Sequence, residues 1–145
     1  MATPSDWLAR YVEARGLEMR AGANPDGPEM SALLDAFSPD GRYVDMPSGA
    51  SWQGRDELRK MFILNFEWAS DQEITFARRL LDGREYVLEG ESRGTNGTGI
   101  GERGRPYSLP FTSVGIFDDE GRVKEQRDYW DRKSWLVQIG AEQAK

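Results

Sequence analysis

The chain has 145 residues, a length typical of one domain that buries a hydrophobic core without disulfides or metals. It contains no cysteine and no histidine, which excludes disulfides, thiolate nucleophiles, sites that need these metal ligands, and Ser-His-Asp catalysis. With 25 acidic against 19 basic residues the net charge is −6, so we expect no nucleic-acid and no membrane partner. Any acid–base catalysis must use Asp, Glu, Tyr, Lys or water.

The sequence favours a cytoplasmic location. No apolar run reaches the length of a membrane span. Residues Met1–Arg10 lack the apolar stretch of a signal peptide and begin with helix-like residues.

The first part of the chain combines helical periodicity with turn residues. Ser5 is a typical N-cap for a helix from Asp6 to about Arg20, which carries an apolar stripe. The next predicted elements are a loop over Gly22–Pro28, a helix over Met30–Phe37, a turn over Ser38–Gly41 and a short strand over Tyr43–Met46.

The clearest helix is predicted over Gly54–Ser70, with Asp56 and Glu57 in its first turn, where the helix dipole favours anions. The remainder favours strands, and Asp82-Gly83 is a strong hairpin signal. We predict strands over Glu73–Leu81, Glu85–Arg93, Tyr107–Phe117 and Arg122–Asp131, and a short helix over Lys133–Gly140. This order predicts a single α+β domain over residues 1–145, with helices packed on one face of a bent sheet.

The glycine-rich segment 94–105 is predicted to be a flexible loop. Two interpretations stay open for it, the tip of a long hairpin or a lid over the mouth of a pocket.

Several acidic side chains are candidates for catalysis. Tyr43 and Asp45 share a face of the short strand, so Asp45 is either a carboxylate beside a phenol in an apolar cavity or a partner for backbone donors near Pro47. Glu89 and Glu91 share one strand face, and Asp128 lies in the last strand; each is a surface or a pocket carboxylate.

Three motifs carry a resemblance to a known family. The segments Y-V-D-M-P at residue 43, W-Q-G-R-D-E-L at residue 52 and D-E-G-R-V-K-E-Q-R-D-Y-W-D at residue 119 resemble the nuclear-transport-factor-2-like superfamily. The similarity is to SnoaL-like polyketide cyclases, limonene epoxide hydrolase and ketosteroid isomerase. It implies a cone-shaped α+β barrel in which a curved mixed, mainly antiparallel sheet wraps over helices and a ligand lies inside.

The resemblance also implies roles for individual residues. Asp45 matches the general base of the isomerase-like members, and Tyr43 matches a Tyr that holds the attacking water in the hydrolase. Asp128 matches the catalytic Asp of the hydrolase and faces the cavity with Gln126. Glu91 falls at its second Asp and Glu89 at the Arg that joins the two carboxylates, a departure that weakens the hydrolase interpretation.

The function implied is a cofactor-independent cyclase or isomerase that closes a ring in a hydrophobic polyketide-type molecule, in antibiotic or other secondary-metabolite biosynthesis. It would act by acid–base catalysis or by folding the substrate for a cycloaddition-type closure. The alternatives are an epoxide hydrolase or epoxide-opening cyclase, a dehydratase or double-bond isomerase, and a non-catalytic ligand-binding or assembly domain. The expected substrate-binding residues are Trp68, Leu109, Phe111, Gln126 and Trp130.

The family resemblance implies a homodimer formed through the outer face of the sheet. Tyr86, Leu88 and Tyr129 are expected to supply this contact.

Overall fold

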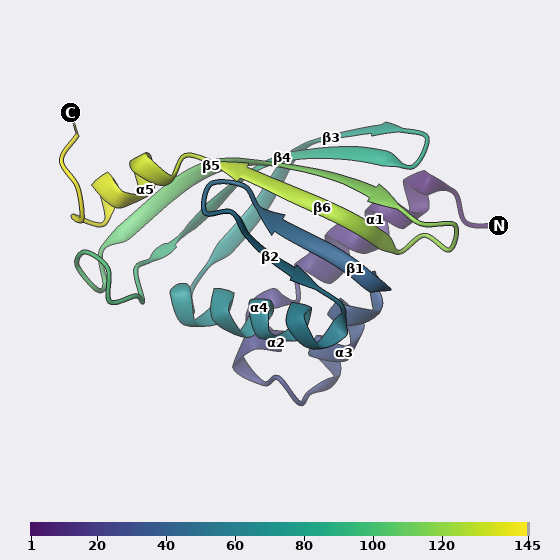
Figure 1. Cartoon of the computed structure of the whole chain (residues 1–145), viewed down its shortest axis with the longest axis horizontal. Coiled ribbons are helices and arrows are strands. Elements are labelled where there is room, and N and C mark those ends of the chain that lie inside the picture. The colour runs from purple at the N-terminus through teal and green to yellow at the C-terminus, as the bar shows by residue number, and fades with distance from the viewer. Residues whose placement is uncertain (145) are drawn as a thin grey trace.

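The computed structural model describes residues 1–144, so Lys145, the last residue of the predicted domain, lies outside the described residues. Within these residues the fold consists of five helices and one curved, six-stranded sheet (Figure 1). The elements are α1 (Pro4–Arg15), α2 (Glu18–Ala23), α3 (Pro28–Asp35), β1 (Phe37–Asp45), β2 (Ala50–Gln53), α4 (Arg55–Trp68), β3 (Glu73–Asp82), β4 (Glu85–Thr95), β5 (Pro106–Phe117), β6 (Val123–Trp130) and α5 (Arg132–Gln138).

The strand order is β2-β1-β6-β5-β4-β3. Strands β1 and β6 pair in parallel, and every other neighbouring pair is antiparallel. The predicted fold class, α+β with a mixed and mainly antiparallel sheet over helices, is confirmed. Strands β2 and β3 form the two free edges, so the sheet does not close into a barrel.

The first predicted helix is wrong at both ends. Thr3, not Ser5, is the N-cap: its hydroxyl accepts the Asp6 N–H at 3.3 Å and its own N–H donates to the Asp6 carboxylate at 2.9 Å. The helix ends at Gly16, and α2 follows as a separate element. This break turns the chain so that α1 and α2 both face the interior.

Two predictions about the first strands are also wrong. Strand β1 runs through the predicted Ser38–Gly41 turn, with a register shift between Phe37 and Arg42. The short edge strand β2 was not predicted, because a four-residue strand gives too little alternation to read.

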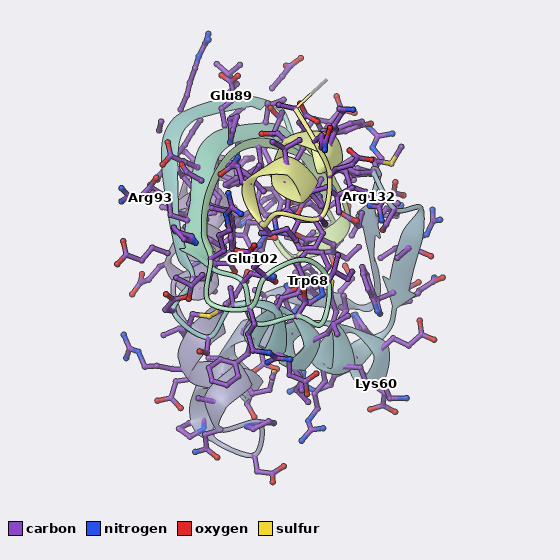
Figure 2. All side chains as sticks on the ribbon, turned by 90° about the vertical axis from the view of Figure 1, so that its left-hand side faces the viewer. Lys60, Trp68, Glu89, Arg93, Glu102 and Arg132 are labelled. Atoms are coloured by element: carbon purple, nitrogen blue, oxygen red, sulfur yellow. The ribbon has the colours of Figure 1, made fainter. Side chains whose placement is uncertain are left out.

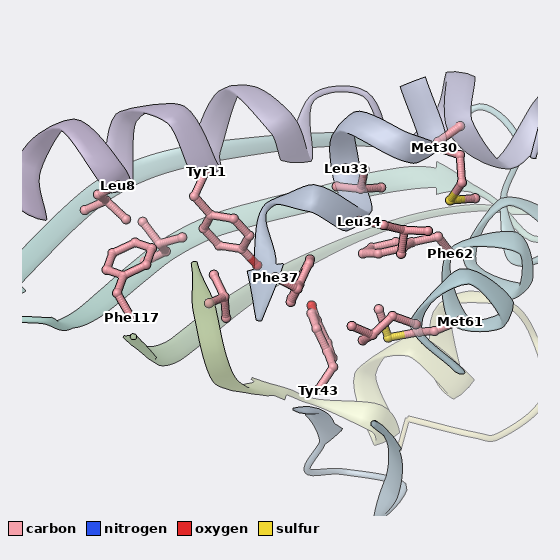
Figure 3. Close-up of a cluster of buried hydrophobic side chains, with 14 of the residues drawn as sticks. Leu8, Tyr11, Met30, Leu33, Leu34, Phe37, Tyr43, Met61, Phe62 and Phe117 are labelled. Atoms are coloured by element: carbon pink, nitrogen blue, oxygen red, sulfur yellow. The ribbon is translucent and has the colours of Figure 1, made fainter. Parts of the chain in front are cut away.

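The main hydrophobic core fills the space between the inner face of the sheet and helices α1, α3 and α4 (Figure 3). A second, smaller cluster closes the end of the molecule near α5 and contains Ala69, Tyr107, Leu109, Trp135 and Ile139. Among residues 1–144, no helix is both long and apolar enough to cross a bilayer.

Candidate active site at Asp128

Parallel pairing of β1 with β6 brings two acidic side chains together. In this register Tyr43 is opposite Gln126, and Asp45 is opposite Asp128. Register partners in a sheet project to the same face, and neighbouring strands lie about 4.8 Å apart. The four side chains therefore form one polar group on the inner face, with Tyr43 and Gln126 buried and both aspartates partly exposed.

The Asp128 carboxylate accepts hydrogen bonds from three side chains. Ser113 Oγ donates at 2.7 Å and Gln126 Nε2 at 2.9 Å, both to Oδ1, while the Tyr43 hydroxyl donates to Oδ2. All three partners act as donors, so the carboxylate is the acceptor in each of these contacts.

The Gln126 side chain lies at the centre of this polar group and is 0% exposed. Its Oε1 accepts from the hydroxyls of Tyr11 and Tyr86, each at 2.6 Å. Its Nε2 donates to Tyr43 Oη at 3.2 Å as well as to Asp128. Both donors and both oxygen lone pairs of the amide are thus used.

A buried ion pair lies behind the phenols. Arg15 is 6% exposed and Glu18 is 2% exposed, and Arg15 Nε contacts Glu18 Oε1. Arg15 Nη1 also donates to Tyr11 Oη at 2.9 Å, and its guanidinium lies 5.5 Å from the ring centroid of Tyr43. Glu18 Oε2 has no hydrogen-bond partner within residues 1–144.

Burial dominates the protonation of these groups. It raises the pKa of Tyr43 well above its ordinary value; Arg15 opposes the shift and Asp128 adds to it. Burial likewise raises the pKa of Tyr11 to about 12. Burial also raises the pKa of Glu18 against the opposing effect of Arg15. Burial lowers the pKa of Arg15, but the Glu18 carboxylate and other neighbours outweigh it, so the pKa lies well above its ordinary value. At neutral pH the phenols are therefore neutral donors and Arg15 is a cation.

Asp45 is held by two donors at the end of β1. Trp130 Nε1 donates to Oδ1 at 2.6 Å, and Ser48 Oγ donates to Oδ2 at 2.5 Å. The Trp130 ring packs edge-on against Trp68 and Trp135, with centroids 6.3 and 6.2 Å apart. The Asp45 carboxylate thus binds two side-chain donors, not the backbone donors near Pro47 that one sequence interpretation expects, and it lies beside Asp128 in the β1–β6 register.

Glu89 and Glu91 do not join this site, so of the two interpretations left open for them, surface or pocket carboxylate, the structure gives the surface one. Glu89 lies 3.6 Å from Arg78, and Glu91 lies 3.4 Å from Arg93 and 2.9 Å from Ser108 Oγ, all on the outer face. Figure 2 shows Glu89 and Arg93 pointing away from the interior. Both strand faces carry polar and apolar residues, so alternation alone could not show which face is inside.

Because alternation could not show which strand face is inside, the prediction is wrong for two of the residues expected at a dimer contact. Tyr86 and Leu88 occupy the inner face of β4 and are fully buried in the main core. Tyr129 does lie exposed on the outer side. The geometry also gives no hydrolase-type arrangement of Asp128, Glu89 and Glu91, because the two glutamates lie on the other side of the sheet.

The expected substrate-binding residues lie around the interior but pack against protein. Trp68 stacks on Trp135 with centroids 4.6 Å apart, Leu109 is buried beside them, and Phe111 packs edge-on against Phe76. Gln126 is enclosed by side chains, and Trp130 contacts Asp45.

Two clefts, of about 550 and 520 Å³, lie elsewhere. The first is lined mainly by the ends of β4 and β5, and the second by β3–β6 around Val87 and Ile116. Neither is lined by Asp45 or Asp128. The apolar hollow that the family resemblance implies is filled here by tyrosine and tryptophan rings.

Sequence reasoning missed Tyr11, Arg15, Glu18, Tyr86 and Ser113. A signal was present in α1: Leu8, Tyr11 and Arg15 are spaced three and four residues apart and so share one helix face. An arginine in line with buried apolar residues indicates a buried cation that needs a partner.

The Gly-rich segment forms the tip of the β4–β5 hairpin. Asn96 is buried, and its Nδ2 donates to the carbonyls of Ile100 and Glu102 at 2.7 and 3.1 Å. Backbone bonds also tie Gly97 to Trp68 and Glu102 to Ile139. These fixed partners contrast with the flexibility predicted from composition, and a role as a lid stays a prediction.

Comparison with known proteins identifies the family. The profile of the SnoaL-like domain matches residues 23–126, which include β1, α4, β4 and the Gln126 position. The chain belongs to the SnoaL-like domain family. A search of curated protein sequences returns no significant match.

Solved structures share the fold of this SnoaL-like chain at low sequence identity. A protein from Catenulispora acidiphila with a ketosteroid isomerase-like fold, in complex with trimethylamine, is 23% identical with a TM-score of 0.73, covering 91% of this chain and 93% of that one. A protein from Jannaschia described as a SnoaL-like polyketide cyclase is 18% identical with a TM-score of 0.74, covering 92% and 94%. A phenazine biosynthesis-related protein from Pseudomonas aeruginosa is 17% identical with a TM-score of 0.73, covering 97% and 87%.

Proposed function

We propose that this SnoaL-like chain is a cofactor-independent cyclase or isomerase that uses Asp128 as a general base on a hydrophobic, polyketide-type substrate. One observation supports this assignment above the others. Three side-chain donors converge on a carboxylate that is only partly exposed, and a buried ion pair lies behind them. Buried ion pairs contribute less to stability than well-packed apolar side chains do, so stability alone does not account for this pair.

The chemistry is proton transfer at carbon. Asp128 removes a proton from a carbon next to a carbonyl, so a C–H bond breaks, an O–H bond forms on the carboxyl group, and the electron pair moves into an enolate. In a ring closure the enolate carbon then attacks a second carbonyl of the same substrate, and Asp128 returns its proton to the resulting alkoxide. No net oxidation or reduction occurs.

Tyr43 would act as the electrophilic partner. Because its pKa lies well above the ordinary value, through burial and through Asp128, its hydroxyl keeps its proton at neutral pH. Once Asp128 holds the substrate proton, the Tyr43 hydroxyl is free to donate to the enolate oxygen. We propose acid–base catalysis rather than cycloaddition by shape, because a carboxylate with three side-chain donors is in place while side chains fill the interior around it.

The test is base catalysis on a model compound. Enzyme-dependent exchange of deuterium into the carbon between two carbonyls of a hydrophobic poly-β-ketone, followed by NMR, reports the first step without the natural substrate. Asp128→Asn should reduce the exchange rate by about 10²–10⁴-fold. Glu89→Gln is the matched control, because that carboxylate lies on the outer face. Full activity in Asp128→Asn would refute the assignment.

A non-catalytic binding or assembly domain is the second candidate. It is favoured by the ring-filled interior and by the 520 Å³ cleft on the sheet, whose lining includes the apolar residues Leu80, Val87 and Ile116. Absence of exchange in the wild-type protein would favour that role.

We further propose a homodimer formed through this cleft. This contact replaces the one expected through Tyr86, Leu88 and Tyr129. Glu125 and Arg127 also line it, so a two-fold axis can place the arginine of one copy beside the glutamate of the other. Val87→Glu should convert a species of twice 16.4 kDa to one of 16.4 kDa in sedimentation. A wild-type mass near 16.4 kDa at micromolar concentration would contradict the proposal. A cytoplasmic location stays a prediction that cell fractionation tests.

A further inference from the structure

The hydrogen bonds of the buried polar group run in one direction. Arg15 is a donor only, because a guanidinium has no acceptor. Its Nη1 donates to Tyr11 Oη at 2.9 Å, so the single Tyr11 proton must point elsewhere. Gln126 Oε1, at 2.6 Å, is the acceptor that it finds.

This first step fixes which end of the Gln126 amide faces Asp128. If the amide were flipped, its nitrogen would face Tyr11, whose proton would then have no acceptor in this contact. With Oε1 towards Tyr11, Nε2 must face Tyr43 and Asp128, at 3.2 and 2.9 Å. Tyr43 therefore accepts from Gln126 and donates its own proton to Asp128.

We infer that Arg15, Tyr11 and Gln126 are positioning residues that hold Asp128 as a hydrogen-bond acceptor, so that it enters the reaction as a general base and not as a general acid. We call Arg15, Tyr11, Gln126, Tyr43 and Asp128 the directional network. This inference deepens the proposed function and rests on it for the catalytic consequence. The direction of the network itself is a property of the free protein.

Tyr86 supplies a matched control for Tyr11. Both phenols donate to the same oxygen at 2.6 Å, and both are fully buried. Only Tyr11 accepts from Arg15 in the contacts described above. In Tyr86→Phe, Arg15 and Tyr11 still fix the amide. In Tyr11→Phe, the amide can flip, because the Tyr86 hydroxyl is able to accept as well as donate. A flipped Gln126 would present its oxygen to Asp128, which favours a protonated Asp128.

The charged and titratable groups around Asp128 come from four elements. Arg15 and Tyr11 belong to α1, Glu18 to α2, Tyr43 and Asp45 to β1 and Tyr86 to β4. For Glu18, Tyr11, Tyr43 and Tyr86 burial is the main cause of a raised pKa, whereas for Arg15 burial acts to lower the pKa and Glu18 is the main raising effect. In the wild-type protein Arg15 is the cation of this group.

The experiment is an NMR titration of the Asp128 side-chain carboxyl carbon in the ligand-free protein. Relative to wild type, Tyr11→Phe should move the titration midpoint up by about one pH unit, and Tyr86→Phe by less than about 0.3 unit. Gln126→Glu should move it up by one unit or more, because two adjacent carboxylates share a proton. Urea unfolding of the two Phe variants checks that their losses of stability are comparable.

Equal shifts in Tyr11→Phe and Tyr86→Phe, or no shift in Gln126→Glu, would overturn the inference. Failure of the proposed function looks different. If the midpoints move as expected but Asp128→Asn retains full deuterium exchange, the directional network stands and the general-base assignment falls. If Asp128→Asn abolishes exchange while the midpoints do not move, the catalytic assignment stands and the positioning role falls.

Discussion

Replacing the buried Arg15–Glu18 pair tests whether stability explains its presence in the interior. In Arg15→Met, the Glu18 carboxylate stays 2% exposed while Oε1 loses its cation and Oε2 still has no partner among the described residues. Removal of one partner of a buried pair typically destabilises by about 3–5 kcal/mol. We expect Arg15→Met to fall in this range.

The reverse change should be milder. In Glu18→Leu, Arg15 keeps its hydrogen bond to Tyr11 and its contacts with the rings of Tyr11 and Tyr43. Each aromatic contact of a desolvated cation is worth about 1–2 kcal/mol, so a loss near 3 kcal/mol is expected. The double variant Arg15→Met/Glu18→Leu buries no charge at these positions and should lie within about 1 kcal/mol of wild type.

Urea unfolding of wild type, both single variants and the double variant closes a double-mutant cycle. The two single losses minus the loss in the double variant give an expected coupling energy of about 5 kcal/mol or more. A double variant that loses as much as the two single variants together would show that the residues do not act as a pair. A double variant destabilised by more than about 3 kcal/mol would show that the pair is held for stability, which removes the main support for a functional interior.

Three further predictions concern other parts of the molecule. Burial raises the pKa of Glu18 above its ordinary 4.5, so this carboxyl favours folding below pH 4.5 and disfavours it as pH rises through the folded-state pKa. The stability of wild type relative to Glu18→Gln should therefore fall as pH rises from 4.5, as measured by urea unfolding across pH. Asn96→Ala removes a buried amide that bonds several groups of its loop, and should lower stability by about 1–3 kcal/mol and speed proteolysis of the hairpin tip. Trp130→Phe removes the indole donor to Asp45 and should lower stability by about 1.5–3 kcal/mol in urea unfolding.

Each of these has a control and a contrary outcome. A pH-independent difference between wild type and Glu18→Gln would mean that burial does not shift this group. Thr98→Ala is the control for Asn96→Ala, because Thr98 bonds mainly to Asn96 and Ile100 within the loop. Equal losses of stability in the two variants would show that the effect is not specific to Asn96. Tyr129→Phe, on the outer face of the same strand, is the control for Trp130→Phe. Equal losses of stability in the two variants would show that the hydrogen bond to Asp45 does not contribute to stability.

The fold and part of the site follow from local sequence features. The period of α4, the Asp82-Gly83 turn and the apolar, aromatic residues of β5 are set by residues close together in the chain, so they predict the α+β class and the element boundaries from α4 onward to within two residues. The Tyr43, Asp45 and Asp128 positions were recognised from short motifs.

What only the tertiary structure decided is which face of each strand is inside and what the interior contains. Strands β4 and β6 carry polar residues on both faces, so the outward position of Glu89 and the inward position of Tyr86 depend on the sheet's curvature over the helices. The parallel register that puts Asp45 beside Asp128 joins strands 83 residues apart, and Arg15 meets its phenols only because α1 packs across them. Such contacts join residues that are far apart in the sequence, so local propensity does not predict them.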